Sequence, residues 1–252
     1  MAANLERLTL EQGRLYAQDQ YALLVIFQAM DAAGKDSTIR HVMSGVNPQG
    51  VHVTSFKAPS AKELDHDYLW RSAVALPERG MIGIHNRSYY EEVLAVRVHQ
   101  EYLVRQRLPK ECVAGDIWAK RFRQINQFER HLVENGTVVV KFFLHVSKGE
   151  QRRRFLERIA EPEKNWKFSM QDVKEREHWK DYERAYEGLL EETSTKRAPW
   201  FVVPADHKWY MQAAVGNILA ETLRKMPLKV PVLDEARRRE LAQAKRLLEG
   251  GG

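Results

Sequence analysis

Cysteine is almost absent from the sequence, whose 252 residues include only Cys112. A single cysteine cannot form a disulfide within the chain, so the class of disulfide-stapled secreted proteins is excluded. A reducing setting fits this composition, and we expect the protein to be cytoplasmic. No other cysteine and no histidine stands at metal-ligand spacing from Cys112, so we expect this thiol to be a small residue of the core.

Long hydrophobic runs are also missing. The longest apolar stretches, 21–27 and 137–144, are far too short to cross a bilayer, and residues 1–20 contain no apolar core of signal-peptide length. We therefore expect no membrane segment and no membrane partner. The sequence also lacks a helix-turn-helix pattern, a zinc-ligand spacing and an RNP-type aromatic motif, which argues against a nucleic-acid partner.

Charged residues, by contrast, are plentiful. Lysine and arginine outnumber aspartate and glutamate by 40 to 34, which gives a net charge of +6 and a pI near 9.3. This balance favours a polyanionic partner, although it does not choose among a nucleotide, polyphosphate, nucleic acid or a membrane surface. With 44% hydrophobic residues, the chain is long enough for one large ordered domain, and we expect residues 1–252 to form a single α/β domain.

Five short apolar runs rich in β-branched residues punctuate the chain, at 22–27, 51–56, 81–85, 137–146 and 200–205. The segments between them, for example 61–76 and 123–136, carry helical periodicity. Strands that alternate with helices predict βαβ units. Because the runs are nearly continuous, we expect a mostly parallel five-stranded sheet with helices on both faces, a three-layer α/β/α fold.

A long, highly charged segment separates the fourth run from the fifth. Residues 147–198 form helices by pattern, with Pro162 as a break, and are too many for a simple crossover. We interpret this segment as a helical lid inserted beyond the sheet; a pair of solvated surface helices is the alternative. Residues 234–249 predict an exposed C-terminal helix that frays at the final glycines.

The stretch VIFQAMDAAGKDSTIRHVM (25–43) has the outline of a phosphate-binding loop, because an apolar run leads into Gly34-Lys35 and a helix-like pattern. It departs from the standard pattern of Gly, four residues and Gly-Lys-Ser/Thr. Ala29 stands at the first glycine position, and Asp36 stands where a hydroxyl normally binds magnesium. A helix start without function is the alternative reading.

Backbone N–H groups in such a turn, and at the start of the helix, would face an anion, and Lys35 would add a mobile positive charge. Asp31 would repel a bare phosphate, so its place inside the loop makes sense only if a metal ion lies between them or if it handles a proton. The residues that we expect to surround the phosphate are Ala32, Ala33, Gly34, Lys35, Asp36, Ser37 and Thr38.

The third apolar run ends in HNRSYYEEV, which places Asn86 and Arg87 at the carboxyl end of a predicted strand. Ligands of open α/β sheets collect at this edge, so these residues should converge with the loop. Arg87 can bind phosphate oxygens with both arms of its guanidinium. Glu91 lies near enough to reach a shared metal ion, although an acid at a helix start is an equally simple explanation.

Basic residues recur near the ends of the second and fourth runs, and a channel of several cations suits a long polyanion. Solvated surface charges are the alternative explanation for all of them. The candidates for binding the chain of phosphates are Lys57, Arg121, Arg152 and Arg153, with Arg87 and Lys35.

Taken in order, these motifs resemble those of the type-2 polyphosphate kinases, nucleotide kinases that use inorganic polyphosphate as phosphoryl donor. The resemblance runs from about Tyr21 to about Leu223. It rests on six separated motifs: MDAAGKDSTIRHV, GVNPQGVHVTSFKAPS, HNRSYYEEVL, RFRQINQFE, EKNWKFS and APWFVVPADHKW. No single motif would suffice, but their order and spacing are specific.

The resemblance implies a P-loop kinase-like core, a helical lid, and Mg²⁺ as cofactor, with Mn²⁺ as an alternative ion. It places the catalytic acid and lysine on Asp31 and Lys35, and an arginine on Arg87. Many members have an aspartate near the metal where this sequence has Asn86, and an asparagine where it has Glu91. This exchange, which puts the metal ligands at Asp31 and Glu91, resembles the subgroup that accepts both nucleoside mono- and diphosphates.

The expected activity is therefore reversible, Mg²⁺-dependent transfer of a phosphoryl group from polyphosphate to AMP or ADP, with guanine nucleotides as further acceptors. We expect a homo-oligomer, a dimer or a tetramer. Lid residues would close over the nucleotide and exclude water, although the two tryptophans are more simply explained as core residues than as platforms for the base. These lid candidates are Arg152, Arg153, Trp166, Arg176 and Trp179.

Two other functions fit parts of the sequence. A P-loop kinase that uses ATP to phosphorylate a nucleotide or metabolite is the main alternative, and the altered loop argues against it. A non-catalytic protein that binds polyphosphate or nucleic acid would fit the basic pI, but the acid in the phosphate loop would then have no purpose.

Overall fold

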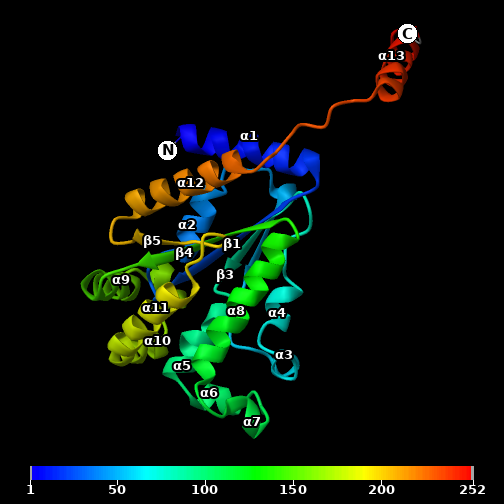
Figure 1. The fold of residues 1–252 in the computed structure, drawn as a ribbon. Helices are drawn as coiled ribbons and strands as arrows, with labels where there is room; N and C mark the ends of the chain where they lie inside the picture. Colours follow the sequence, from blue (N-terminus) through cyan, green and yellow to red (C-terminus); the bar gives the residue numbers. More distant parts are fainter. Residues whose placement is uncertain (1, 251–252) are drawn as a thin grey trace.

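The computed structural model describes residues 2–250, and its centre is a five-stranded sheet in the order β2-β3-β1-β4-β5 (Figure 1). All four strand pairings in this part of the chain are parallel, and Val25 lies opposite both Ile84 and Val140. Each predicted apolar run is a strand, so the α/β prediction is confirmed. The strands are β1 (Ala22–Ala29), β2 (Val51–Ser55), β3 (Ile82–Asn86), β4 (Thr137–His145) and β5 (Trp200–Pro204).

Helices cover both faces of the sheet. Side chains of β1 alternate between two hydrophobic clusters: Leu23, Val25 and Phe27 enter one, whereas Leu24 and Ile26 enter the other. Figure 1 shows α1 (Ala2–Gln18), α2 (Lys35–Val42) and α12 (Lys208–Lys225) on one face. The opposite face carries α8 (Ile117–Glu134) and α11 (Trp179–Thr193). The predicted three-layer arrangement is therefore confirmed.

Three expectations need correction. The second apolar run forms an edge strand that is partly exposed, with Val53 at 45% exposure, because nothing pairs with its outer side among the described residues. Residues 61–76 form only two short helices, α3 (Ala61–Leu64) and α4 (Trp70–Ala73). Cys112 is exposed on the short helix α7 (Lys110–Val113), so it is not a core residue.

Segment 147–198 is helical. It contains α9 (Lys148–Ala160), α10 (Met170–Glu175) and two 3₁₀ turns, η3 (Pro162–Lys167) and η4 (Arg176–His178), before it reaches α11. Ala185 and Leu189 of α11 are buried in the core, so this helix belongs to the body of the domain. The movement of the remaining helices as a lid stays a prediction.

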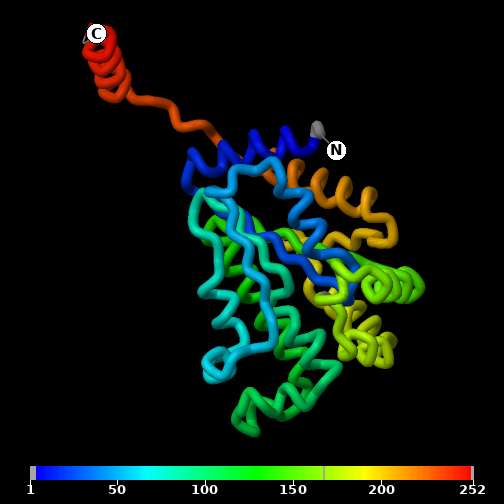
Figure 2. Tube along the Cα trace, turned by 180° about the vertical axis from the view of Figure 1, so that it is seen from behind, coloured from blue at the N-terminus to red at the C-terminus, as the bar shows by residue number. Residues whose placement is uncertain are grey.

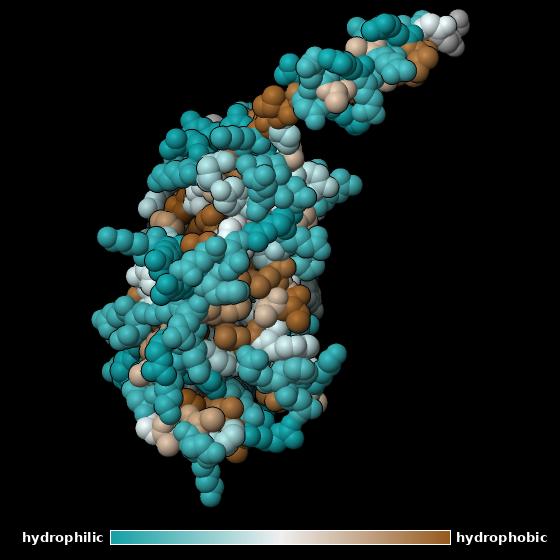
Figure 3. Space-filling view, turned by 45° about the vertical axis from the view of Figure 1, so that its right-hand side comes forward, coloured by the Kyte–Doolittle hydropathy of each residue, from teal (hydrophilic) through white to brown (hydrophobic). Residues whose placement is uncertain are grey.

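The last helix, α13 (Glu235–Gly250), projects away from the body of the molecule (Figures 1 and 2). Every side chain of α13 is exposed, as expected for the C-terminal helix. The face shown in Figure 3 is mainly hydrophilic, with hydrophobic side chains in scattered patches. Within residues 2–250, no helix has the length and apolar character needed to cross a membrane. The short helices α5 (Ala95–Val98) and α6 (Glu101–Val104) and the 3₁₀ turn η2 (Tyr89–Val93) complete the region after β3.

Candidate active site

The carboxyl ends of β1 and β3 bring the phosphate loop and Arg87 together. The two strands are neighbours, with Phe27 opposite Asn86, so the residues that follow them emerge at the same edge of the sheet. There the Arg87 guanidinium donates a hydrogen bond to Asp31 at 3.1 Å (Nη2 to Oδ1). Both side chains remain partly exposed, at 41% and 29%, so they stay accessible to a ligand.

The backbone at this edge adopts an uncommon conformation at two residues that are not glycine. Ala32 has φ +60° and Arg87 has φ +65°, both in the left-handed region. Such a conformation costs about 1–3 kcal/mol per residue and persists only where the surrounding structure imposes it. The Arg87 N–H donates to the Phe27 carbonyl at 3.0 Å, which holds the turn after β3 against β1. The fold therefore keeps the two parts of the site in a fixed, strained geometry.

Gly34 caps the N-terminus of α2 and has φ +104°. The first intrahelical bond runs from the Thr38 N–H to the Gly34 carbonyl at 3.0 Å, so the N–H groups of the first turn have no acceptor in a preceding turn of helix. The Ser37 and Thr38 hydroxyls also donate to the Gly34 carbonyl, each at 2.9 Å. These N–H groups and the helix dipole provide a binding place for an anion.

Lys35 lies at the centre of the charged groups. Its Nζ donates to the Ala29 carbonyl at 3.0 Å, which holds the ammonium against the loop. Burial lowers the pKa of Lys35, and the nearby Arg87 lowers it further, whereas Asp31, Glu91 and Asp36 oppose this shift. A desolvated ammonium between these acids is well placed to bind a phosphate oxygen.

Glu91, on η2, shares this electrostatic environment. The negative charge of Glu91 is the main cause of the raised pKa of Arg87, ahead of burial, which lowers it, and of Asp31, which raises it. Asn86 has another role, because its amide nitrogen donates to Asp36 Oδ1 at 2.6 Å. The structure therefore brings Glu91 toward the cations of the site and ties Asn86 to the start of α2.

A metal ion at this site would rely on Asp31 and Glu91. Within residues 2–250, no group of three or more histidine, cysteine, aspartate or glutamate side chains is arranged to hold a metal by itself. Mg²⁺ commonly binds one or two carboxylates and takes its other ligands from water and substrate phosphates. The oxygen donors of Asp31 and Glu91 fit that incomplete set, which phosphate oxygens would complete.

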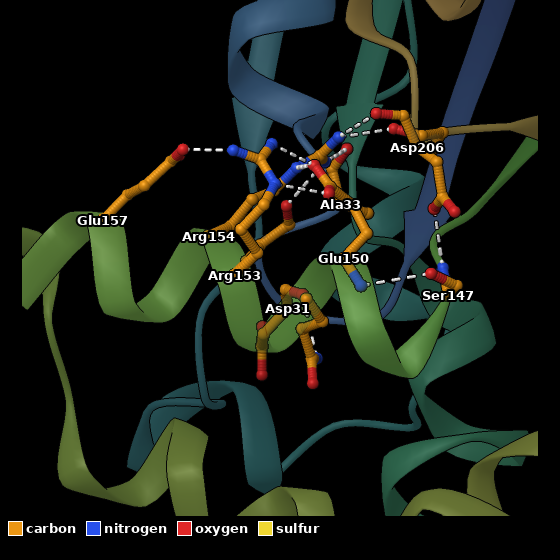
Figure 4. A network of polar contacts seen from close by, with 11 residues as sticks. Asp31, Ala33, Ser147, Glu150, Arg153, Arg154, Glu157 and Asp206 are labelled. Atoms are coloured by element: carbon orange, nitrogen blue, oxygen red, sulfur yellow. Dashed lines mark hydrogen bonds and ion pairs between the residues drawn. The ribbon is translucent and has the colours of Figure 1, made fainter.

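Arg154, on α9, clamps the phosphate loop from outside (Figure 4); it belongs to the basic run after the fourth strand but is not among the residues predicted for the site. Its side chain is only 6% exposed. One arm of the guanidinium donates to the carbonyls of Ala32 and Ala33 at 2.9 and 2.8 Å. The other arm donates to Ala205 and Asp206, the residues after β5, at 2.6 and 3.0 Å. The helical period could have indicated that Arg154 points inward, because positions 151, 154 and 155 form the buried face of α9.

The predicted neighbours of Arg154 lie on the exposed side of α9. Arg153 pairs with Glu150 and Glu157, as Figure 4 shows, and Arg152 is exposed. Lys57 is exposed at the end of β2, where its carbonyl accepts a hydrogen bond from Arg71. The structure therefore does not bring these three cations into contact with the loop.

Two further candidates are buried elsewhere. Arg121 pairs with Glu92 at 2.9 Å, with both side chains under 10% exposed, and stacks on Tyr68. It is committed to the packing of α8 and is not available to a phosphate chain. Trp179 is 6% exposed, and its indole donates to Glu183 at 2.7 Å. Trp179 is therefore a core residue and does not form a contact surface for the nucleotide.

Arg176 connects the predicted lid to the loop. Its guanidinium donates to Gln151 Oε1 at 2.5 Å and to the Lys148 carbonyl at 3.2 Å. Gln151 in turn donates to the Asp31 carbonyl at 3.0 Å. Trp166, on η3, is 78% exposed and belongs, like Arg176, to the helical segment 147–198. A continuous chain of polar contacts thus runs from η4 through α9 to Asp31.

A parallel α/β/α core with a lysine-bearing phosphate loop after β1, and an arginine after β3, defines a P-loop kinase-like phosphotransferase. The sequence profile of the polyphosphate kinase 2 family matches residues 2–230. The chain belongs to this family.

Individual relatives agree with the family profile. The chain is 54% identical to ADP-polyphosphate phosphotransferase of Rhodopseudomonas palustris, over 98% of this chain and 86% of that protein. It is 49% identical to AMP/ADP-polyphosphate phosphotransferase of Meiothermus ruber, over 89% and 80% of the two chains. The crystal structure of polyphosphate kinase 2 from Arthrobacter aurescens superposes with a TM-score of 0.86 at 41% identity, covering 96% of this chain and 84% of that one. The resemblance of the sequence to type-2 polyphosphate kinases is thereby confirmed.

Proposed function

We propose that the protein transfers the terminal phosphoryl group of inorganic polyphosphate to AMP and to ADP. Family membership supports the donor and the reaction class. The names of the two relatives support the acceptors, since one is an ADP and the other an AMP/ADP phosphotransferase. The convergence of Asp31, Lys35 and Arg87 at the end of β1 is the observation that carries the proposal.

The residues of the site have separable roles in this mechanism. The N–H groups of the α2 start and the Lys35 ammonium hold the phosphoryl group that is transferred. The Arg87 guanidinium, pre-positioned by Asp31, binds the oxygens on which charge develops. Positioning and charge stabilisation supply most of the catalysis in phosphoryl transfer, so no strong base is required.

A divalent metal is a general requirement for phosphoryl transfer of this kind, and we propose Mg²⁺, with Mn²⁺ as a substitute. Asp31 and Glu91 would hold the ion. When bound, the ion would neutralise negative charge on the phosphates. Asn86 cannot supply a charge, and its amide instead fixes Asp36 at the start of α2. The acid at position 91 would therefore take the role that an aspartate at position 86 has in other members.

The exposed cations would guide the polyphosphate chain toward the site, and the helices after α9 would close over it. Lys57, Arg152 and Arg153 lie on accessible surface, so they can contribute through long-range attraction. Trp166 and Arg176 are the proposed lid contacts of the nucleotide. We also propose that the active form is a homo-oligomer in the cytoplasm.

One assay tests the function. The purified chain is incubated with ADP, Mg²⁺ and long-chain polyphosphate in the absence of ATP, and the ATP formed is measured. We expect ATP to form with ADP, and ADP and then ATP to form with AMP. Phosphorylation that needs ATP, with none from polyphosphate, would instead identify an ATP-dependent nucleotide or metabolite kinase.

A further inference from the structure

A groove lies between α8 and the C-terminal half of α11, and it includes none of the residues assigned to the active site. Its volume is about 910 Å³, which lies within the usual range of small-molecule sites, about 300–1,000 Å³. The walls come from α5, from α8 and α11, and from residues 195–198 before β5. α8 and α11 pack against each other in the helical layer of Figure 1. The reaction at the end of β1 therefore does not account for this groove.

The lining has an excess of positive charge. It contains five cations, Arg97, Arg123, Arg130, Lys196 and Arg197, and three acids, Asp116, Glu191 and Glu192. Arg130 pairs with Glu134 at 2.8 Å. In the part of the chain that the structure describes, the other four cations form no ion pair within 4.0 Å. An anionic ligand would neutralise them.

The Arg97 side chain is held in a defined position in the groove. Its guanidinium lies over the ring of Phe122, 5.7 Å from the centroid. One nitrogen, Nη1, is enclosed and finds no hydrogen-bond acceptor among residues 2–250. A Cβ at position 188 would lie only 3.1 Å from this nitrogen, so Gly188 leaves the space that the guanidinium needs. An enclosed N–H group without an acceptor is costly, and a bound anion beside the guanidinium would offset part of that cost.

Acceptors lie close to these cations. The Asn126 amide nitrogen donates to the Glu192 carbonyl at 2.8 Å, whereas its oxygen is enclosed and finds no donor among the described residues. The Glu191 and Glu192 carboxylates are exposed acceptors in the same lining. Trp118 adds a partly exposed aromatic surface. The ligand should therefore combine an anionic group, hydrogen-bond donors and a flat apolar part.

We propose that this groove is a second nucleotide site, which takes a nucleoside phosphate apart from the site of phosphoryl transfer. The phosphates bind the four unpaired cations, the ribose hydroxyls and base amino groups donate to the exposed carboxylates of Glu191 and Glu192, and the base contacts Trp118. A polyphosphate chain fits less well, because it carries no donors on its bridging length and the three acids repel it. The proposal requires only binding, so it does not depend on the proposed reaction.

Equilibrium dialysis with radiolabelled ADP and Mg²⁺ tests the proposal on the full chain. We expect two ADP per chain at saturation. The double variant Lys196→Gln/Arg197→Gln changes only exposed side chains, and should weaken one of the two sites by about tenfold or more. Arg184→Gln provides a matched control, since Arg184 is an exposed arginine of α11 outside the groove and should leave both sites unchanged.

Three outcomes would overturn the second site. These are a stoichiometry of one ADP per chain in a protein that forms ATP from ADP and polyphosphate, unchanged binding in both Lys196→Gln/Arg197→Gln and Arg97→Met, and displacement of the groove-bound ADP by excess sulfate, which would mark a surface for any anion. ATP formation from polyphosphate is measured in a separate assay, so a failure of the proposed function is distinguishable from a failure of the groove.

Discussion

Lys141 and Glu129 form an ion pair in the interior of the domain, with 2.6 Å between Nζ and Oε2 and exposures of 0% and 2%. Tyr89 and Tyr90 both donate their hydroxyls to the other carboxylate oxygen, at 2.9 and 2.7 Å. These tyrosines stand between Arg87 and Glu91 in the sequence. The buried pair on β4 and α8 therefore anchors the segment that carries two residues of the active site.

Replacement of Lys141 by methionine should destabilise the protein by about 3–5 kcal/mol, because it leaves the Glu129 carboxylate buried without a counter-charge. Burial raises the pKa of Glu129 and lowers that of Lys141, with their mutual attraction opposing both shifts. Urea unfolding measures the change. In the double variant Lys141→Met/Glu129→Leu the loss should be smaller than in the single variant, because no charge remains buried. A midpoint equal to that of the wild type in the single variant would contradict this account.

Asp31→Asn and Lys35→Ala should each reduce the rate of ATP formation by about 10²–10³-fold, since each removes a charge that acts on the phosphoryl group. Asp31 is partly exposed, and Lys35→Ala removes a desolvated charge rather than an apolar core contact, so the unfolding midpoint should change little. Initial rates with ADP and polyphosphate measure the effect, and Arg184→Gln serves as a control on exposed charge. If either active-site variant keeps a near-wild-type rate, the site is elsewhere.

The sheet could be predicted because its strands are short, continuous apolar runs, and burial on both faces leaves a strong signal in β1 and β4. The loop and the carboxyl edge followed from the parallel order of strands, which brought Asp31 and Arg87 together as expected. The helices of 61–76 could not be predicted as well, since their periodicity belongs to a segment beside an exposed edge strand where tertiary contacts, rather than propensity, decide the structure.

The roles of individual arginines were the least predictable feature. The run Arg152 to Arg154 reads as one basic cluster, yet Arg154 turns inward to backbone carbonyls while Arg153 stays with two glutamates on the surface. Arg121 likewise depends on Glu92, which is distant in sequence. A partner contributed by another element leaves no pattern near the residue itself, so charge runs alone could not separate structural from exposed cations.

Arg154→Lys tests the clamp on the phosphate loop. Lysine keeps the charge but cannot reach two pairs of carbonyls with one ammonium, so buried carbonyls lose their donors at a cost of about 1–3 kcal/mol. We expect a lower kcat with a smaller change in KM for ADP, because the loop holds the transferred group and not the nucleoside. Initial rates at varied ADP concentration measure both constants, and urea unfolding measures the stability. An unchanged kcat together with reduced stability would show that the clamp is purely structural.

The lowered pKa of Lys35 predicts an earlier loss of activity as the pH rises. Burial and Arg87 lower this pKa below the ordinary lysine value of 10.5, against the opposing effect of Asp31, Glu91 and Asp36. The ammonium is present below the lowered pKa and is lost above it, so kcat/KM for polyphosphate should fall at a lower pH than an ordinary lysine would allow. Between the two pKa values the unfolded chain binds a proton that the folded chain has lost, so this group's contribution to the free energy of unfolding rises with pH. Lys35→Arg keeps its charge throughout, so the alkaline limb of its pH profile should move to higher pH, even if its maximal rate is reduced. A limb at the same pH in both proteins would assign it to another group.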